Sequence, residues 1–146
     1  MSIDPLDLEA QICFPLHAAS RAVTQAYGEL LSESGLTYPQ YLVMLVLWQA
    51  EQPLTVGELG ERLRSDSGTL TPVLKRLEGS GRVARRRSTE DERKVLVSAT
   101  PEGLRLREEL KPVPQKLASL TGLGPDELEQ LKGLLGRIME SIDVRS

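Results

Sequence analysis

The sequence contains one cysteine, one histidine and few aromatic residues, which make up 3% of its 146 residues. A single cysteine cannot form an internal disulfide, as expected for a protein in a reducing cytoplasm. One histidine and one cysteine also give no cluster of metal ligands, and neither a glycine-rich phosphate loop nor a Ser-His-Asp spacing occurs. We therefore expect no metal, no other cofactor and no catalytic residues.

Long apolar segments are missing as well. The longest apolar run, 41–48, has eight residues, whereas a membrane-spanning helix needs about 20. The first residues carry neither the basic nor the apolar region of an export signal, so we expect a cytoplasmic protein with no membrane partner. The 40% of hydrophobic residues suffice for the core of one domain, built mainly from aliphatic side chains.

Positive charge is concentrated in the middle of the chain. Residues 62–94 contain 10 of the 18 Lys and Arg but only 5 of the 21 Asp and Glu, a net charge of +5, whereas the remainder has a net charge of −8. Such a patch attracts a polyanion, of which nucleic acid is the most common. Charge alone fits an unpartnered, solvated face equally well, so the order of the structural elements has to decide.

Hydrophobic periodicity predicts helices near both ends of the chain. Apolar residues in 12–30 and 128–142 recur at spacings of three and four, the pattern of helices that pack along one another. Pro15 should make the first helix either start near Phe14 or bend there, because proline cannot donate a backbone hydrogen bond. The prolines in 112–114 should likewise kink or split the helix that begins at 101.

The middle of the chain is predicted to form a winged helix-turn-helix. Capping boxes at Thr37 and Thr55 open two helices, and a turn at 65–68 opens a third. Two short helices joined by a tight turn, the second basic on its outer face, form a helix-turn-helix. Strands predicted at 83–86 and 94–99 make a basic hairpin directly after it, which is the position of a wing.

This order of elements resembles the MarR family of bacterial transcription regulators, and 91–103 looks like the wing signature of that family. Residues 11–14, 36–42 and 66–72 are similar to the organic hydroperoxide resistance regulators within it, and three matches in order make the resemblance specific. It implies a mainly α fold with a small β-hairpin wing, as a homodimer on a palindromic DNA operator. We expect one domain, 1–146, with dimerisation helices at 6–35 and 101–146 and a DNA-binding lobe at 37–100.

In that family a cysteine near the N-terminus senses peroxides and two tyrosines hydrogen-bond to it. The resemblance assigns these roles to Cys13, Tyr27 and Tyr38, with His17 where some members have a further tyrosine. Without a second cysteine, the chain is similar to the members whose oxidised thiol is captured by a small cellular thiol. Cys13 and Tyr27 are 14 residues apart, about 21 Å along one helix. A shared site therefore requires Tyr27 to come from the partner subunit.

We expect the start of the recognition helix to face the major groove, with lysine and arginine near phosphates. Arg93 at the wing tip, held by Asp91, suits a narrow minor groove. Arg85 and its two neighbours, at the base of the wing, are placed for phosphate contact. The residues expected to bind DNA are Ser67, Thr69, Thr71, Lys75, Arg76, Arg86, Arg87, Asp91 and Arg93.

The resulting hypothesis is a repressor, and not an enzyme, that leaves its operator when an organic hydroperoxide oxidises Cys13. The chemistry agrees, because phenol donors stabilise the reactive thiolate and its oxidation gives a reversible sulfenic acid. Two alternatives stay open. One is a regulator of the same family controlled by a noncovalent ligand such as a phenolic acid, with an inert Cys13. The other, less favoured because no arginine or threonine closely follows Cys13, is a one-cysteine thiol peroxidase.

Overall fold

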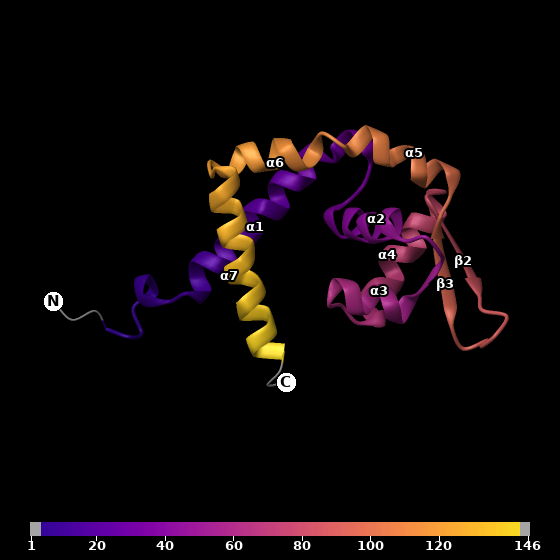
Figure 1. Ribbon diagram of the computed structural model, residues 1–146, viewed down its shortest axis with the longest axis horizontal. Helices are drawn as coiled ribbons and strands as arrows, with labels where there is room; N and C mark the ends of the chain where they lie inside the picture. Colours follow the sequence, from indigo (N-terminus) through magenta and orange to yellow (C-terminus); the bar gives the residue numbers. More distant parts are fainter. Residues whose placement is uncertain (1–3, 144–146) are drawn as a thin grey trace. The chain divides into compact units, whose positions relative to one another are not determined.

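The computed structural model in Figure 1 describes residues 4–143. The chain divides into two compact units, the first ending at Lys111 and the second beginning at Pro112. The second unit contains α6 (Val113–Thr121) and α7 (Pro125–Asp143). The first unit contains, in order, η1 (Leu8–Ala10), α1 (Cys13–Leu30), η2 (Ser32–Ser34), α2 (Tyr38–Gln49), β1 (Leu54–Thr55), α3 (Val56–Leu63), α4 (Ser67–Gly79), β2 (Val83–Arg87), β3 (Val95–Ala99) and α5 (Pro101–Leu110).

The predicted helix starts are confirmed by their side-chain caps. Both capping boxes are present: the backbone N–H groups of Gln40 and Glu58 donate to the hydroxyls of Thr37 and Thr55, and the Gln40 and Glu58 side chains accept from the two cap N–H groups in return. Asp66 caps α4 by accepting a 2.7 Å hydrogen bond from the Thr69 N–H. These bonds satisfy amide donors that have no partner inside a helix.

The two predicted proline effects are also present. The first long helix begins at Cys13, so Pro15 falls in its first turn, where an amide hydrogen would have no carbonyl partner inside the helix. The helix that opens with Thr100 as N-cap ends at Leu110, and a separate helix begins at Val113. The prolines of 112–114 therefore split the predicted helix into α5 and α6.

The sheet has the strand order β1-β3-β2 and is antiparallel throughout. The hairpin of β2 and β3 is in register from Val83 opposite Ala99 to Arg87 opposite Val95. β1, which has two residues, pairs with the other edge of β3 and was not predicted. Val97, in the middle strand, is fully buried and anchors the hairpin to the core.

The core of the first unit lies between α2, α3, α4 and the sheet. Its fully buried side chains are Leu31, Val43, Met44, Leu59, Leu74, Leu77 and Val97. The tight turn from α3 to α4 depends on Gly60, because a Cβ there would lie 2.5 Å from the Ser65 carbonyl oxygen. Arg64, in this turn, adopts the left-handed conformation with φ = 53°. These two residues allow α3 and α4 to pack closely as a helix-turn-helix (Figure 1).

The helices near the two ends of the chain behave differently from the core helices. Among the residues that the structure describes, neither α1 nor α7 contains a buried residue. Phe14 and Leu16 of α1 are exposed, as are several apolar side chains of α7, namely Leu131, Leu134, Ile138, Met139 and Ile142. Apolar faces of this kind are typical of surfaces that a second protein molecule covers. Within residues 4–143, no helix has the length and apolar character needed to cross a membrane.

Candidate functional site

The first candidate surface is the exposed start of α4, the second helix of the helix-turn-helix. Ser67 and Thr69 are exposed there, Thr71 is half-buried, and Lys75 and Arg76 are exposed one turn further on. The Thr71 hydroxyl donates a 2.6 Å hydrogen bond to the Ser67 carbonyl, so its oxygen can still accept one from a ligand. Asp66 at the N-cap keeps its carboxylate ionised, because the hydrogen bonds from Thr69 hold its pKa below the ordinary value.

The loop of the β2–β3 hairpin holds its arginine in a defined position. Arg93 makes a two-pronged contact with Asp91, from Nε to Oδ1 at 3.1 Å and from Nη2 to Oδ2 at 3.4 Å. The side chain of Arg93 is still 90% exposed, against 30% for Asp91. The hydrogen bonds from Arg93 lower the pKa of Asp91, so the pair remains ionised at neutral pH and presents a guanidinium to solvent.

The three arginines at the base of the hairpin do not share one environment. Arg86 and Arg87 are exposed, and Arg87 donates to the Glu92 carbonyl at 3.0 Å across the loop. Arg85 is half-buried and pairs with Glu78 of α4 at 3.0 Å. This ion pair makes Arg85 a link between hairpin and helix, and the phosphate contact expected for Arg85 stays a prediction.

A second candidate site is a cluster of aromatic rings where α1 ends and α2 begins. The Tyr27 and Tyr38 rings stack with centroids 4.7 Å apart. Tyr41, buried as predicted for a core residue, lies 5.4 Å from Tyr27 and 6.5 Å from Trp48. Trp48, for which a structural role was predicted, donates from Nε1 to the Gly103 carbonyl at 2.9 Å and so links α2 to α5.

The tyrosines of this cluster keep their protons well above neutral pH. Burial, together with the charges that Tyr41 and Tyr38 would carry, raises the pKa of Tyr27 to about 12. Burial also raises the pKa of Tyr38, and burial and Tyr38 raise that of Tyr41. Within residues 4–143, the hydroxyls of Tyr27 and Tyr38 have no hydrogen-bond partner. The site therefore offers two neutral phenol donors to an incoming acceptor.

The structure brings Tyr27 and Tyr38 together but keeps Cys13 apart from them in the same chain. Cys13 is the first residue of α1 and is exposed. Tyr27 is in the same straight helix 14 residues later, about 21 Å away. His17, one turn after Cys13, is also exposed. No group of three or more metal-binding side chains occurs in the described part of the chain.

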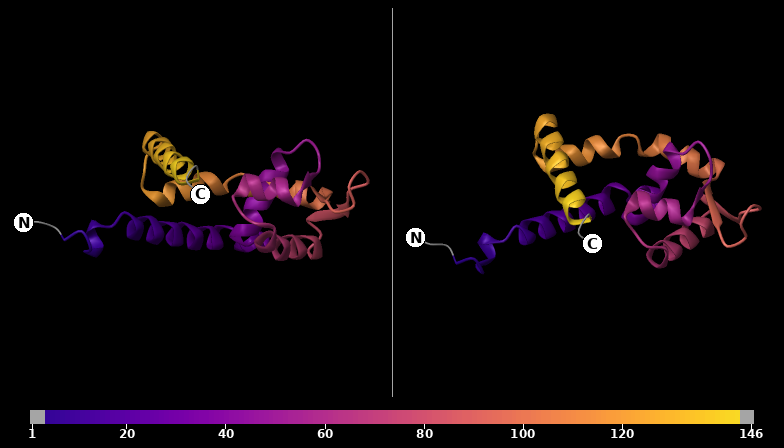
Figure 2. Two further views of the ribbon diagram at one scale, coloured as in Figure 1. Left: turned by 90° about the horizontal axis from the view of Figure 1, so that it is seen from below. Right: turned by 60° about the horizontal axis from the view of Figure 1, so that its bottom comes forward.

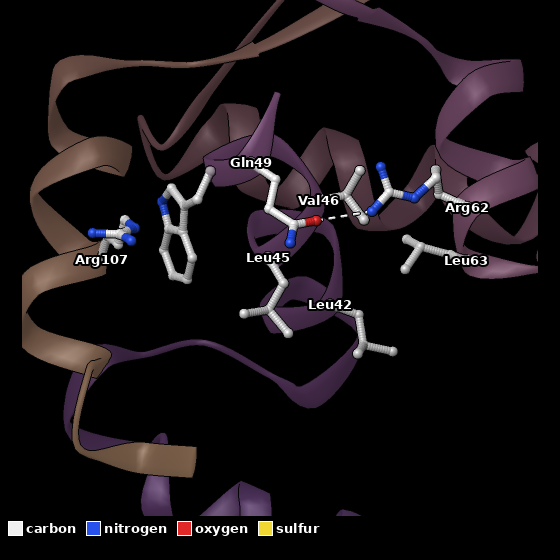
Figure 3. A pocket seen from close by; sticks show the side chains of 8 residues that line it. Leu42, Leu45, Val46, Gln49, Arg62, Leu63 and Arg107 are labelled. Carbon is white, nitrogen blue, oxygen red and sulfur yellow. Dashed lines mark hydrogen bonds between the residues drawn. The ribbon is translucent and has the colours of Figure 1, made fainter. Parts of the chain in front are cut away.

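A third feature, which the sequence did not indicate, is a groove on α2 between α3 and α5 (Figure 3). Its volume is about 500 Å³ and it is lined by Leu42, Leu45, Val46, Trp48, Gln49, Arg62, Leu63 and Arg107. Arg62 donates to Gln49 Oε1 at 2.8 Å. The spacing of Tyr38, Leu42, Leu45 and Gln49 along α2 was the available signal, because steps of four, three and four lie on one helix face.

A helix-turn-helix followed directly by an antiparallel hairpin with a basic tip defines the class of winged-helix proteins. The profile of the family described as transcriptional regulator SarA/Rot matches residues 25–110. The organic hydroperoxide resistance transcriptional regulator of Bacillus subtilis (strain 168) is 46% identical over 139 residues, which cover 95% of this chain and 94% of the relative. The HTH-type transcriptional regulator TtmR of Methylorubrum extorquens (strain PA1) is 45% identical over 98% of this chain and 73% of its own length.

Among solved structures, reduced AbfR bound to DNA is similar, with a TM-score of 0.78 and 36% identity over 92% of this chain and 94% of that one. AbfR, from Staphylococcus epidermidis, has also been solved overoxidized on DNA and in a disulfide form. The chain therefore belongs to the MarR/SarA family of winged-helix transcriptional regulators, in the branch of the organic hydroperoxide resistance regulators. The predicted fold class and the family resemblance are confirmed.

Proposed function

We propose that this protein is a homodimeric repressor that releases its DNA operator when an organic hydroperoxide oxidises Cys13. It acts in the cytoplasm without metal or cofactor, and as a regulator and not as an enzyme. The observation that carries the proposal is the pair of stacked phenols, Tyr27 and Tyr38, at the opposite end of α1 from the single cysteine. Relatives that cover almost the whole chain include an organic hydroperoxide resistance regulator.

The sensor is completed by the second subunit. In a two-fold dimer the α1 helices run antiparallel, so residue i of one subunit meets residue j of the other and the reverse. The start of one α1 then lies beside the end of the other, which places Cys13 next to the partner's tyrosine pair. Neutral phenols without another partner donate hydrogen bonds to the thiolate and favour the form that reacts with peroxide.

The chemistry needs one oxidant and one small thiol. The Cys13 thiolate attacks the terminal peroxide oxygen, and the S–O bond of a sulfenic acid forms as the O–O bond breaks. The alkoxide that leaves takes up a proton from water and becomes an alcohol. With no second cysteine in the chain, a small thiol then attacks the sulfur, water leaves and a mixed disulfide remains. The added group widens the dimer interface, which changes the separation of the two DNA-binding lobes.

The DNA-binding role rests on the exposed groups of α4 and the wing. Ser67, Thr69 and Thr71 face the major groove, and Arg93 enters the minor groove with Asp91 as its support. Exposed cations on either side of these groups, Lys75, Arg76, Arg86 and Arg87, contact phosphates. The net charge of +5 in residues 62–94 supplies the attraction.

The domain organisation that fits this function has dimerisation helices in 6–35 and 101–146 and the DNA-binding lobe in 37–100, with 144–146 lying outside the described residues. The exposed apolar side chains of α1 and α7 support it, because water-exposed apolar faces of this size are costly in a monomer. Sedimentation at low micromolar concentration should give about twice the 16.1 kDa of one chain. A stable monomer would contradict both the shared sensor and the palindromic operator.

The direct test measures operator binding before and after one equivalent of an organic hydroperoxide, with and without a small thiol. Loss of binding should require the peroxide, should be accompanied by a mixed disulfide when the thiol is present, and should be reversed by a reductant. Loss of binding with a phenolic acid alone would instead favour noncovalent control. The groove on α2, with Arg62 and Arg107, is the observation that keeps this second function in consideration.

A further inference from the structure

The segment before α1 is an acidic, apolar arm. Residues 4–12, called the arm here, contain Asp4, Asp7 and Glu9 and no basic residue. Its apolar side chains are turned outward: Leu6 is 89% exposed, Leu8 52% and Ile12 75%. Apolar contacts within the chain therefore do not explain the conformation of the arm.

Hydrogen bonds hold the arm in its shape. The Gln11 side chain donates to the carbonyls of Pro5 at 2.6 Å and Asp7 at 3.0 Å. The Leu6 N–H donates to Asp4 Oδ1 at 2.8 Å, and η1 forms the turn between these contacts. The arm is therefore preorganised, with leucines and carboxylates presented to whatever covers it.

The groove on α2 has the complementary character. Leu42 and Leu45 line its floor, and Arg62 and Arg107 stand at its sides (Figure 3). Arg62 donates to the neutral amide of Gln49, so this contact does not neutralise the positive charge of Arg62. An acidic segment with exposed leucines matches this surface in both charge and hydrophobicity.

The position of Cys13 in the proposed dimer brings the arm to the groove. Tyr38 is the first residue of the α2 face that continues through Leu42 and Leu45 to Gln49, about 16 Å along the helix. The nine residues of the arm, partly 3₁₀ and partly extended, span roughly 20 Å. If Cys13 lies beside the partner's Tyr38, the residues just before it are within reach of the partner's groove.

The arm cannot reach the groove of its own chain in this way. It precedes the first residue of α1, whereas α2 follows the last one, and α1 has 18 residues, about 27 Å. Both views in Figure 2 show the start of α1 far from α2. The occupant that fits is thus the arm of a second copy of this chain.

We propose that residues 4–12 of one protomer dock in the α2 groove of its partner, with Leu6 and Leu8 against the leucines and the acidic side chains toward Arg62 and Arg107. The proposal rests on the dimeric sensor described above and adds a connection to it. Arg62 and Leu63 belong to α3, the first helix of the helix-turn-helix. A displacement of Cys13 in one subunit is passed through the arm to the DNA-binding helices of the other.

Cysteine crosslinking tests the contact in a Cys13→Ser variant, because this change removes the single cysteine of the sequence. In a Cys13→Ser background, the pair Leu8→Cys and Leu45→Cys should give a covalent dimer under mild oxidation. The matched control pairs Leu8→Cys with Leu104→Cys, another exposed leucine of the first unit outside this groove, and should stay monomeric on a denaturing gel. Each cysteine substitution made alone in the same background measures crosslinking between the same position in the two subunits.

Charge reversal in the groove gives a second test. Arg107→Glu should reduce crosslinking of the Leu8–Leu45 pair by about fivefold, as for the loss of one ion pair. Arg105→Glu, exposed on the same helix but outside the groove, should leave it unchanged. The proposal would be overturned if the control pair crosslinked equally well, if the disulfide formed within one chain, or if no crosslink formed. It would also be overturned by stronger crosslinking between Leu45→Cys and Leu134→Cys of α7. Since Cys13 is absent from these chains, failure here is separate from failure of peroxide sensing.

Discussion

Tyr27 and Tyr38 stack with ring centroids 4.7 Å apart and an angle of 23° between their planes. This contact joins the last turn of α1 to the first turn of α2. Among the described residues, α1 has none that is buried, whereas α2 contributes several side chains to the core. All three tyrosines of the sequence take part in one cluster through Tyr41. A signal that displaces Tyr27 or Tyr38 therefore acts at the junction of α1, the proposed dimerisation helix, with α2 of the proposed DNA-binding lobe.

Cys13→Ser should bind operator DNA as wild type does and should no longer respond to organic hydroperoxide. Serine has nearly the same size and can hydrogen-bond, but it cannot form a sulfenic acid. The measurement is an operator-binding titration with and without peroxide, with the wild-type protein in parallel. The sensor assignment fails if the variant still leaves DNA after peroxide treatment.

Tyr27→Phe and Tyr38→Phe should each slow the oxidation of Cys13 without abolishing it. Either change removes one phenol donor and keeps the ring, so stabilisation of the thiolate is weakened while stacking is retained. The rate is followed by trapping the sulfenic acid over time. Tyr41→Phe is the matched control, because Tyr41 is a core residue and its loss of a hydroxyl should leave the rate close to that of wild type.

The phenols should titrate above the ordinary tyrosine value in the folded protein. In the unfolded chain they ionise at about 10, whereas the pKa of Tyr27 is raised to about 12 and those of Tyr38 and Tyr41 are raised as well. A raised folded pKa gives stability that is complete below pH 10 and is lost as the pH rises from 10 toward 12. Tyrosinate absorbance against pH, native and in denaturant, measures this. A native phenol that ionises at its unfolded value would contradict the cluster.

Arg93→Ala should weaken operator binding by roughly 1–3 kcal/mol, the range for one lost specific contact. The guanidinium is exposed and oriented by Asp91, so its loss should leave the fold intact. Affinity measured at several salt concentrations separates this effect from general phosphate contacts. Lys132→Ala, which removes an exposed cation of α7 paired with Glu129, serves as control. Unchanged affinity for Arg93→Ala would remove the wing from the DNA-binding surface.

Gly60→Ala should lower the free energy of unfolding by about 1–3 kcal/mol, since overpacking costs this much and the new Cβ would lie 2.5 Å from the Ser65 carbonyl oxygen. Gly57→Ala in the same helix is the control. Its Cβ would meet only the Thr55 hydroxyl oxygen at 3.8 Å, so stability should stay constant or rise by up to about 1 kcal/mol. Denaturant unfolding of both variants gives the comparison. If Gly60→Ala were as stable as the wild-type protein, the turn would tolerate a side chain at position 60.

Local signals in the sequence predicted most of the helices and the hairpin. Thr37 and Thr55 with their partners three residues later, and Pro112 with its neighbours, act within one turn of a helix, so their effects are readable without the rest of the fold. β1 was missed because a strand of two residues has no period of its own and exists only by pairing with β3. The pairing of Arg85 with Glu78 could not be predicted because it depends on how the hairpin and α4 pack.

Four features could be read from the chain without its structure: the class of the protein, the single thiol, the basic stretch at 62–94 and the separation of Cys13 from Tyr27 along one helix. These follow from residue type and spacing, which the chain carries before it folds. The folded structure was needed to show that Tyr38 stacks on Tyr27, that Arg85 pairs with Glu78 and that α2, α3 and α5 enclose a groove with two arginines. Such relationships join residues distant in sequence or on different elements, and packing of the whole lobe is what fixes them.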